Sequence, residues 1–444
     1  MRTDQKEFNE VKSAGKNKKM KVFKFGGASV KDAQAVKNVG KVIQQFDDKL
    51  VIVISAMGKT TNTLEKLVNA YYFKQGNVAA ILEETKAFHF SIINELFENK
   101  KHAIYTDIHN TFVEIEWEIE EEPQRSYDYV YDQIVSVGEL LSTKIVSAYL
   151  NEEHLTNIWL DVRSVIQTDN TYRNANINWK LTEQLALELF AKNKALSTSN
   201  YIVTQGFIGA SSENFTTTIG REGSDFTAAI LAYCLNAESV TIWKDVPGML
   251  NADPKWFDDT QQLNHISYHE AVELAYYGAT VIHPKTIKPL QNKKIPLLVK
   301  SFLDPNQKGT LVDGNTAEDE LIPSFIFKMQ QVLISISAKD YSFIVEDNLS
   351  QIFSQLSAHK ITVNMMQNSA ISFSICVDFN PFTTYQFIEE LQKEYQVLYN
   401  ENLELVTIRH YDAATIERVT ANKQILVEQK SRNTARFVMK DKVG

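Results

Sequence analysis

The sequence predicts an α/β fold with a mostly parallel sheet sandwiched by helices, followed by a smaller unit with a different order of elements. Up to about residue 300, short runs rich in Val and Ile alternate with longer segments of helical period, an order typical of parallel strands joined by helices. From Val332 the order becomes strand, helix, two strands, helix and strand, which is the ferredoxin-like βαββαβ pattern. A segment rich in Asp, Pro, Gly and Asn at residues 304–322 separates the two patterns, so we place a domain boundary there.

The individual elements follow from local composition and period. The strands expected in the parallel sheet lie at residues 21–25, 50–55, 157–161, 201–205, 239–243 and 295–300. Between residues 128 and 150, apolar side chains recur at intervals of three and four, which predicts one helix with a single buried face, and Glu139 lies off that face. The second unit is expected to have strands at 332–337, 361–366, 371–378 and 403–410 and helices through 349–356 and 387–391. After residue 410 there is room for one short helix and two strands, at 425–429 and 434–440.

Composition excludes several classes of protein. The 444 residues include 46 Lys and Arg against 55 Asp and Glu, a net charge of −9, so we expect no nucleic-acid partner. Cys234 and Cys376 lie apart in apolar runs, which predicts neither a disulfide framework nor a zinc site. No apolar run reaches the ~18 residues of a membrane span, and residues 1–19 are polar and lysine-rich. We therefore expect a cytoplasmic protein without a membrane partner, whose first nineteen residues form a disordered extension.

The first candidate site follows the first strand, where Gly26 and Gly27 precede Ser29. In an open α/β sheet, ligands bind at the carboxyl ends of strands, and glycines there let the backbone approach a phosphate. By itself, a glycine pair marks an ordinary tight turn more often than a phosphate site. Lys24 favours the phosphate site, because an ammonium group on a central strand needs an anionic partner.

Two further segments carry polar residues at strand ends. Residues 55–62, SAMGKTTN, lack the glycine that a nucleotide P-loop requires five positions before Gly58, so Thr61 and its neighbours either bind a small polar ligand or cap the next helix. Residues 204–232 combine a glycine-rich loop with Arg221, Ser224 and Asp225. Ser224 or Asp225 could simply cap a helix, but capping does not explain the arginine, so we favour a site. An arginine there can hold a carboxylate through two hydrogen bonds, and an aspartate can orient lysines or a metal ion.

His265 and His269 have the four-residue spacing of metal ligands on a helix. The intervening residues supply no glutamate in the metalloprotease position, so we expect neither histidine to bind metal.

Taken in order, the segments KFGGAS, SAMGKTTN, SVGE, TQGFIG, TTTIGREGSD, IWKDVPG, NADPK and GATVIHP strongly resemble the aspartokinase family. The resemblance implies the amino-acid kinase fold at residues 20–310, an ACT-type regulatory domain at 325–410 and a reduced second ACT-type segment at 411–444. It implies a monofunctional enzyme that transfers the γ-phosphate of ATP to the β-carboxylate of L-aspartate. The product is 4-phospho-L-aspartate, in the first step toward lysine, threonine and methionine. The implied cofactors are ATP and Mg²⁺, the latter held through the ATP phosphates rather than by protein ligands.

The resemblance also implies roles for individual residues. Lys24 and Asp225 are expected at the reacting phosphate. Aspartate is expected to contact Thr61, Glu139, Phe207, Arg221 and Ser224, with Glu139 meeting its ammonium group and Arg221 a carboxylate. ATP is expected to contact Gly26, Gly27, Ser29, Lys244, Asp245, Leu250, Lys255, Thr280 and Val281.

Departures from the family pattern lead to one hypothesis. Glu222 stands where the family has a glycine, which adds a negative charge near two anionic reactants. Thr280 replaces a lysine, while Lys244 stands where the family has a threonine. We expect Lys244 to replace the missing positive charge beside the ATP phosphates.

Two other functions stay open at this point. A kinase of the same fold could phosphorylate another acid, such as acetylglutamate or glutamate, although those relatives generally lack the SVGE-like motif and the ACT tail. A ligand-sensing pseudokinase would bind amino acids without turnover, as Glu222 and Thr280 suggest, but retention of Lys24, Arg221 and Asp225 argues against it.

The tail predicts assembly and weak regulation. Polar residues around one strand of the first ACT-type unit could form an effector pocket: Thr362, Asn364, Gln367 and Ser369. The second unit is reduced, so we expect feedback inhibition to be weak or absent. Because open strand edges need covering, we expect a homodimer joined through residues 330–444.

Overall fold

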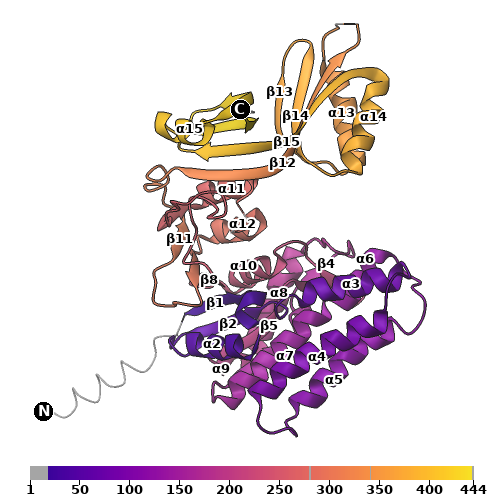
Figure 1. Cartoon of the computed structure of the whole chain (residues 1–444). Helices are drawn as coiled ribbons and strands as arrows, with labels where there is room; N and C mark the ends of the chain where they lie inside the picture. The colour runs from indigo at the N-terminus through magenta and orange to yellow at the C-terminus, as the bar shows by residue number, and fades with distance from the viewer. Residues whose placement is uncertain (1–18, 280–281, 341, 443–444) are drawn as a thin grey trace, which may run out of the picture. The chain divides into compact units, whose positions relative to one another are not determined.

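The computed structural model describes residues 19–279, 282–340 and 342–442. Most of the predicted disordered extension, and the predicted ATP-binding residues Thr280 and Val281, lie outside the described residues. The chain divides into two compact units (Figure 1). The described residues of 1–249, 264–271 and 282–315 form the first unit, and those of 250–263, 272–281 and 316–444 form the second.

The first unit is built on a sheet whose strand order, within the described residues, is β3-β5-β2-β1-β8-β10-β11-β9. Its strands are β1 (Met20–Phe25), β2 (Lys49–Ile54), β3 (Asn157–Leu160), β5 (Tyr201–Gln205), β8 (Ser239–Lys244), β9 (His265–Ser267), β10 (Leu297–Ser301) and β11 (Thr310–Asp313). Neighbours from β3 to β10 are parallel, whereas β11 is antiparallel to β10. The six predicted strands are confirmed. A small second sheet pairs β4 (Gln167–Thr168), β6 (Ile208–Ser211) and β7 (Thr216–Thr218).

The helices and turns of the first unit are η1 (Gly27–Val30), α2 (Ala33–Ile43), α3 (Thr60–Tyr72), α4 (Val78–Leu96), α5 (Ile104–Glu118), α6 (Tyr127–Val135), α7 (Val137–Glu152), η2 (Val162–Ser164), α8 (Trp179–Lys192), α9 (Lys194–Thr198), α10 (Gly223–Leu235) and α12 (Pro284–Lys293). Helix α11 (Tyr268–Tyr277) contributes residues to both units. Helices α3, α4, α5 and α7 pack on one another beside the sheet (Figure 1).

The predicted single helix at residues 128–150 is wrong in one respect, because the structure has two helices there, α6 and α7. Ser136 lies between them, after the last residue of α6 and before the first residue of α7, and its hydroxyl donates a hydrogen bond to the carbonyl oxygen of Gln133 in α6 at 3.2 Å. The apolar period continues through this junction, so periodicity alone could not reveal the break.

Strand β1 is central, and its two faces have different surroundings. Phe23 and Phe25 are buried in the large apolar cluster that includes residues of α2 and α7. The side chain of Lys24 points to the opposite face, because side chains alternate along a strand. Helix α10 packs on β1, β2 and β8. The alternation of β1 therefore places a buried lysine against the start of α10.

The second unit is built on an antiparallel sheet with the order β13-β14-β12-β15-β17-β16 among the described residues. Its elements are β12 (Ser324–Ala338), α13 (Glu346–Ala358), β13 (Val363–Asn368), β14 (Ser372–Asp378), α14 (Thr383–Glu394), β15 (Tyr395–Arg409), α15 (Ala413–Thr420), β16 (Lys423–Lys430) and β17 (Thr434–Asp441). The βαββαβ order from β12 to β15 is the predicted one, as are the short helix and two strands that follow it.

Two long strands join the halves of this sheet. The first part of β12, residues 324–328, pairs with 405–409 of β15, and β15 in turn pairs with β17. The second part of β12, residues 331–338, pairs with both β14 and residues 395–403 of β15. Hydrogen bonding is therefore continuous across residue 410, and the predicted domain boundaries stay predictions. In the part of the chain that the structure describes, no helix has the length and apolar character needed to cross a membrane.

Candidate active site

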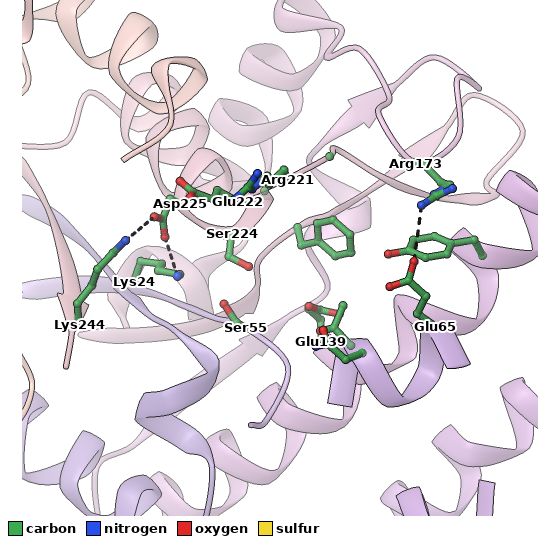
Figure 2. A pocket seen from close by; sticks show the side chains of 16 residues that line it. Lys24, Ser55, Glu65, Glu139, Arg173, Arg221, Glu222, Ser224, Asp225 and Lys244 are labelled. Carbon is green, nitrogen blue, oxygen red and sulfur yellow. Dashed lines mark ion pairs between the residues drawn. The ribbon is translucent and has the colours of Figure 1, made fainter. Parts of the chain in front are cut away.

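A buried cluster of opposite charges lies at the carboxyl end of β1. Lys24 Nζ is 2.6 Å from Asp225 Oδ1, and Lys244 Nζ, at the end of β8, is 3.8 Å from Asp225 Oδ2. Figure 2 shows both lysines directed at this aspartate, whose side chain is only 3% exposed. Buried charges need partners of opposite sign. Asp225, in the first turn of α10, therefore pairs with two lysines, one from β1 and one from the neighbouring strand β8.

These residues line a pocket of about 550 Å³ in the first unit. Eight of the predicted site residues meet in it: Lys24, Thr61, Glu139, Phe207, Arg221, Ser224, Asp225 and Lys244. Asn62, a neighbour of Thr61 that was expected to bind a small polar ligand or cap the next helix, lines the pocket too. The lining residues without a predicted role are Ser55, Glu65, Tyr131, Arg173, Gly220 and Gly223, and Glu222 was recognised only as a departure from the family. The available signal for Arg173 was its position in a loop dense in Asp and Asn, residues 169–178, between a strand and a helix.

Gly27, one of the two glycines predicted to bind phosphate, packs tightly against the turn after β2. A Cβ atom at Gly27 would lie 2.8 Å from the carbonyl oxygen of Gly58 and 2.9 Å from that of Ala56. Gly58 N–H donates to the Gly27 carbonyl oxygen at 3.1 Å, which joins the turn after β1 to the turn after β2. Gly26, Gly27 and Ser29 are not among the described residues that line the pocket, so their contact with ATP stays a prediction.

Glu139 is fully buried near the start of α7. Its Oε1 accepts a hydrogen bond from Ala56 N–H at 3.3 Å, and its Oε2 has no hydrogen-bond partner among the described residues. Burial raises the pKa of Glu139 to about 8, and the hydrogen bond from Ala56 only partly offsets this effect. The pocket therefore contains a carboxyl group that is poised to ionise when a cation arrives.

Glu222 begins α10 in a left-handed conformation, with φ of +54°. Such a backbone favours glycine, which explains why the family pattern has a glycine at this position. One carboxylate oxygen of Glu222, Oε2, is buried without a hydrogen-bond partner among the described residues. Carboxylate oxygens are the donors that Mg²⁺ prefers, so Glu222 fits a magnesium ion that enters with ATP, whereas each oxygen of Asp225 already faces a lysine.

Three of the other predicted ATP contacts, all among the described residues, do not line this pocket. Asp245 is exposed directly after β8. Leu250 and Lys255 belong to the second unit. Their contact with ATP, like that of Thr280 and Val281, stays a prediction.

The predicted effector residues lie on and beside β13. Asn364 already has several partners: its Oδ1 accepts from Lys328 Nζ at 2.7 Å, and its Nδ2 donates to Gln331 Oε1 at 2.8 Å and to Asp378 Oδ1 at 2.9 Å. The side chain of Asn364 thus joins β12, β13 and β14. Thr362, Gln367 and Ser369 are exposed, and an effector role for all four stays a prediction.

Of the two histidines with helical spacing, His265 pairs with a carboxylate. His265 Nε2 lies 2.8 Å from Asp313 Oδ1, between the neighbouring strands β9 and β11. Within the described residues, no group of three or more His, Cys, Asp and Glu side chains is arranged to hold a metal ion.

A model of the amino acid kinase family matches residues 19–301. The chain is similar to lysine-sensitive aspartokinase 3 of Escherichia coli, with 31% identity over 396 residues that cover 87% of this chain and 86% of that protein. It is 32% identical to an aspartokinase of Chlamydia trachomatis over 315 residues, 70% of this chain and 69% of that protein.

Among solved structures, the chain resembles E. coli aspartokinase III in complex with aspartate and ADP, with a TM-score of 0.78 and 28% identity over 94% of this chain and 96% of that one. The complex of the same E. coli enzyme with lysine and aspartate has a TM-score of 0.79. The fold, the pocket and these relatives lead to one conclusion: the chain belongs to the amino acid kinase family and, within it, to the aspartokinases.

Proposed function

We propose that this aspartokinase transfers the γ-phosphate of ATP to the β-carboxylate of L-aspartate, giving 4-phospho-L-aspartate in the pathway to lysine, threonine and methionine. The observation that carries the proposal is a single pocket with Lys24, Lys244 and Asp225 at one end and Glu139 with Arg221 along its length. The similar E. coli structure with aspartate and ADP supports the choice of acceptor and nucleotide.

The reaction requires little from the protein beyond positioning and charge neutralisation. The acceptor carboxylate is already ionised at pH 7, so no general base is needed. Lys24 and Lys244 hold the transferred phosphoryl group, and Asp225 fixes both ammonium groups between β1 and β8. Mg²⁺ bound through the ATP phosphates would neutralise phosphate charge, and the carboxylate of Glu222 would hold it on the protein side.

The acceptor is selected by its charges. Glu139 binds the ammonium group of aspartate, and Arg221 binds a carboxylate. A plain dicarboxylate lacks the ammonium group and would leave the buried Glu139 without a partner. The raised pKa of Glu139 means that binding of the ammonium group expels a proton from this residue at pH 7.

The test is to trap the acyl phosphate as its hydroxamate with purified protein, ATP and Mg²⁺, and to compare aspartate, glutamate and acetylglutamate as acceptors. We expect product with aspartate alone. Product with glutamate or acetylglutamate would show a kinase for another acid. Binding of aspartate without product from any acceptor would show a sensing pseudokinase.

The finer aspects of the proposal concern place and assembly. We propose a cytoplasmic homodimer joined through residues 330–444. Strands β13 and β16 are the edges of the sheet in the described part of the second unit, and pairing with a second subunit is a common way to cover such edges.

A further inference from the structure

We propose that Asp132 is a positioning residue of the acceptor site, whose buried carboxylate holds together the two loops that carry Arg173 and Arg221. Both arginines line the pocket (Figure 2). Asp132 lies on α6 and is not among the described residues of the lining, so it acts through its hydrogen bonds to these loops. The inference rests on the function proposed above and adds to it a residue that governs the affinity for aspartate.

The carboxylate of Asp132 is fully buried, and its hydrogen-bond donors come from two segments that are distant in the sequence. The backbone N–H of Arg173 lies 3.1 Å from its Oδ1 and 3.0 Å from its Oδ2. Thr218, the last residue of β7, donates its backbone N–H to Oδ2 at 2.8 Å and its hydroxyl to Oδ1 at 2.7 Å. Three donors thus converge on one carboxylate, which joins α6 to the loop at residues 169–178 and to the end of β7.

These donors require the ionised form of Asp132. A protonated carboxyl group carries a hydrogen on one oxygen, so it would face at least one of the three donors with another donor. Burial raises the pKa of Asp132 to about 7, although the hydrogen bonds from Thr218 and Arg173 act in the opposite direction. The carboxylate therefore depends on its donors to stay charged. The donors depend equally on the carboxylate, because a buried N–H without an acceptor is costly.

Beyond Asp132, the two loops also interlock directly. Ala175 N–H donates to the Thr218 carbonyl oxygen at 3.0 Å. Gly220, with φ of +87°, has so little room that a Cβ atom there would lie 2.5 Å from Asn174 Oδ1. Residues 220–223, which follow β7, all line the pocket. A shift at the end of β7 therefore moves a whole section of the pocket wall.

Helix α6 also connects Asp132 to the helix that carries Glu139. Only one residue separates α6 from α7. Tyr131, the neighbour of Asp132 on α6, lines the pocket itself, and the guanidinium group of Arg173 lies over its ring at 4.5 Å. The elements that present Glu139 and Arg221, the two proposed partners of the charged groups of aspartate, therefore meet at Asp132.

A role in stability alone is separable from a positioning role, because β7 offers a matched pair of threonines. Thr217 is fully buried, like Thr218, and its hydroxyl lies 2.7 Å from the Thr168 hydroxyl in the small second sheet. Side chains alternate along a strand, so Thr217 faces away from Asp132. Valine at either position removes one buried hydroxyl at nearly constant volume, but only at Thr218 does it remove a hydrogen bond to Asp132.

The experiment compares Asp132→Asn, Thr218→Val, Thr218→Ser and the control Thr217→Val. Asparagine keeps the size of aspartate but replaces one acceptor oxygen by an NH₂ group that faces donors. Initial rates at pH 8, above the pKa of Asp132, give kcat and the KM values for aspartate and ATP. Calorimetric titration with aspartate alone gives its dissociation constant, thermal melts give stability, and amide hydrogen exchange reports on the two loops.

We expect Asp132→Asn to raise the KM and the dissociation constant for aspartate ~10- to 100-fold, the range for lost hydrogen bonds to a charged group, with the KM for ATP within about twofold. Its kcat at saturating aspartate should stay within about threefold of the wild type. Amide exchange should become faster in both loops, at residues 169–178 and 216–223.

The threonine variants separate positioning from stability. Thr218→Val should raise the KM for aspartate ~10-fold, and Thr218→Ser, which keeps the hydroxyl, should restore it. Thr217→Val should lower the melting temperature, as Thr218→Val does, yet leave the KM for aspartate unchanged. A merely structural role would give the two valine variants the same kinetics.

Three results would overturn the inference: an aspartate KM in Asp132→Asn within about twofold of the wild type, an equal rise in Thr217→Val and Thr218→Val, or unchanged amide exchange in either loop. If Asp132→Asn does not fold, the threonine variants decide. Failure of the proposed function is a separate outcome. The wild-type protein would then form no aspartyl phosphate, whereas the calorimetric titration would still measure the effect of Asp132 on aspartate binding.

Discussion

Glu139 is the residue whose chemistry depends most on its surroundings. Burial raises its pKa to about 8, so at pH 7 the empty site holds it mostly protonated. Binding of aspartate should therefore release a proton at pH 7, and the KM for aspartate should fall as the pH rises toward about 8. Calorimetric titration in two buffers of different ionisation enthalpy measures the released proton directly. Equal heats in the two buffers would contradict the assignment.

The same pKa predicts how the stability of the ligand-free protein changes with pH. Between the unfolded pKa of 4.5 and the folded value of about 8, the native state binds more protons than the unfolded state. The contribution of Glu139 to stability is therefore lost as the pH rises through this window. Glu139→Gln serves as the control: its melting temperature should fall less than that of the wild type between pH 5 and pH 8.

Lys24 should be essential for turnover, because a cation at the transferred phosphoryl group acts mainly in the transition state. We expect Lys24→Ala to lower kcat by ~10²-fold or more. It should also lower the melting temperature, since it leaves Asp225 buried with only Lys244 beside it. Lys21→Ala is the matched control, because Lys21 lies on the same strand and pairs with Asp48 at 2.8 Å away from the pocket. A Lys24 variant within threefold of the wild-type kcat would refute the role.

Replacing Lys244 tests whether its positive charge takes the place of the family lysine that is missing at Thr280. The ammonium group of Lys244 is 3.8 Å from Asp225, beside Lys24, which we propose holds the transferred phosphoryl group. Lys244→Ala should raise the KM for ATP several-fold and leave the KM for aspartate nearly unchanged, as measured by initial rates. Lys300→Ala, which removes a lysine that lies over Trp243 but does not line the pocket, should change neither. An unchanged KM for ATP in Lys244→Ala would end the exchange hypothesis.

At the scale of elements, the turns after β1 and β2 depend on each other through Gly27. An added Cβ would meet two carbonyl oxygens at 2.8 and 2.9 Å, and backbone atoms can yield only by moving both turns. Overpacking of this kind costs ~1–3 kcal/mol. We expect Gly27→Ala to lower the melting temperature and to reduce kcat at least tenfold, since both turns border the transfer site.

The control for this prediction is Gly314→Ala, where an added Cβ has no atom within 4 Å. Thermal melts of both variants decide the matter. If the two melt at the same temperature and are equally active, the close packing of the two turns is not what Gly27 provides.

At the scale of the whole molecule, the second unit should govern assembly. We expect sedimentation equilibrium to give about twice the 50.6 kDa chain mass, with the edge strand β13 in the interface. Met366 on this strand is 52% exposed, and Met366→Lys should favour the monomer because a lysine on an edge strand opposes pairing. Leu321→Lys, at a 70% exposed position outside the sheet, is the control. A wild-type monomer at micromolar concentration would contradict the proposal.

Feedback inhibition should be weak or absent, because the second ACT-type segment is short and Asn364 is already hydrogen-bonded within the sheet. Activity measured with millimolar lysine, threonine and both together tests this expectation. Strong inhibition at low concentration would show that the second unit forms a working effector site.

The sequence alone determined the parallel sheet, the βαββαβ order of the second unit and half of the pocket. These features depend on local signals: β-branched runs for the strands, glycines at the turns, and a lysine such as Lys24 in a strand where burial demands an anion. The eight motifs, taken in their order along the chain, were specific enough to identify the family. Lys24, Asp225 and Glu139 were predicted because each stands inside such a motif, and the structure places all three in one pocket.

Only the tertiary structure decided what depends on contacts between distant segments. Arg173 belongs to no motif, and its place in the pocket comes from Asp132 on α6 and Thr218 on β7, which are far from it in the sequence. The break at Ser136 is invisible to periodicity because the apolar stripe continues through it. The pKa of Glu139 likewise follows from complete burial, which the sequence does not reveal for a residue off the apolar face of its helix. In each case the deciding quantity is which groups surround a side chain, and that is fixed when the chain packs.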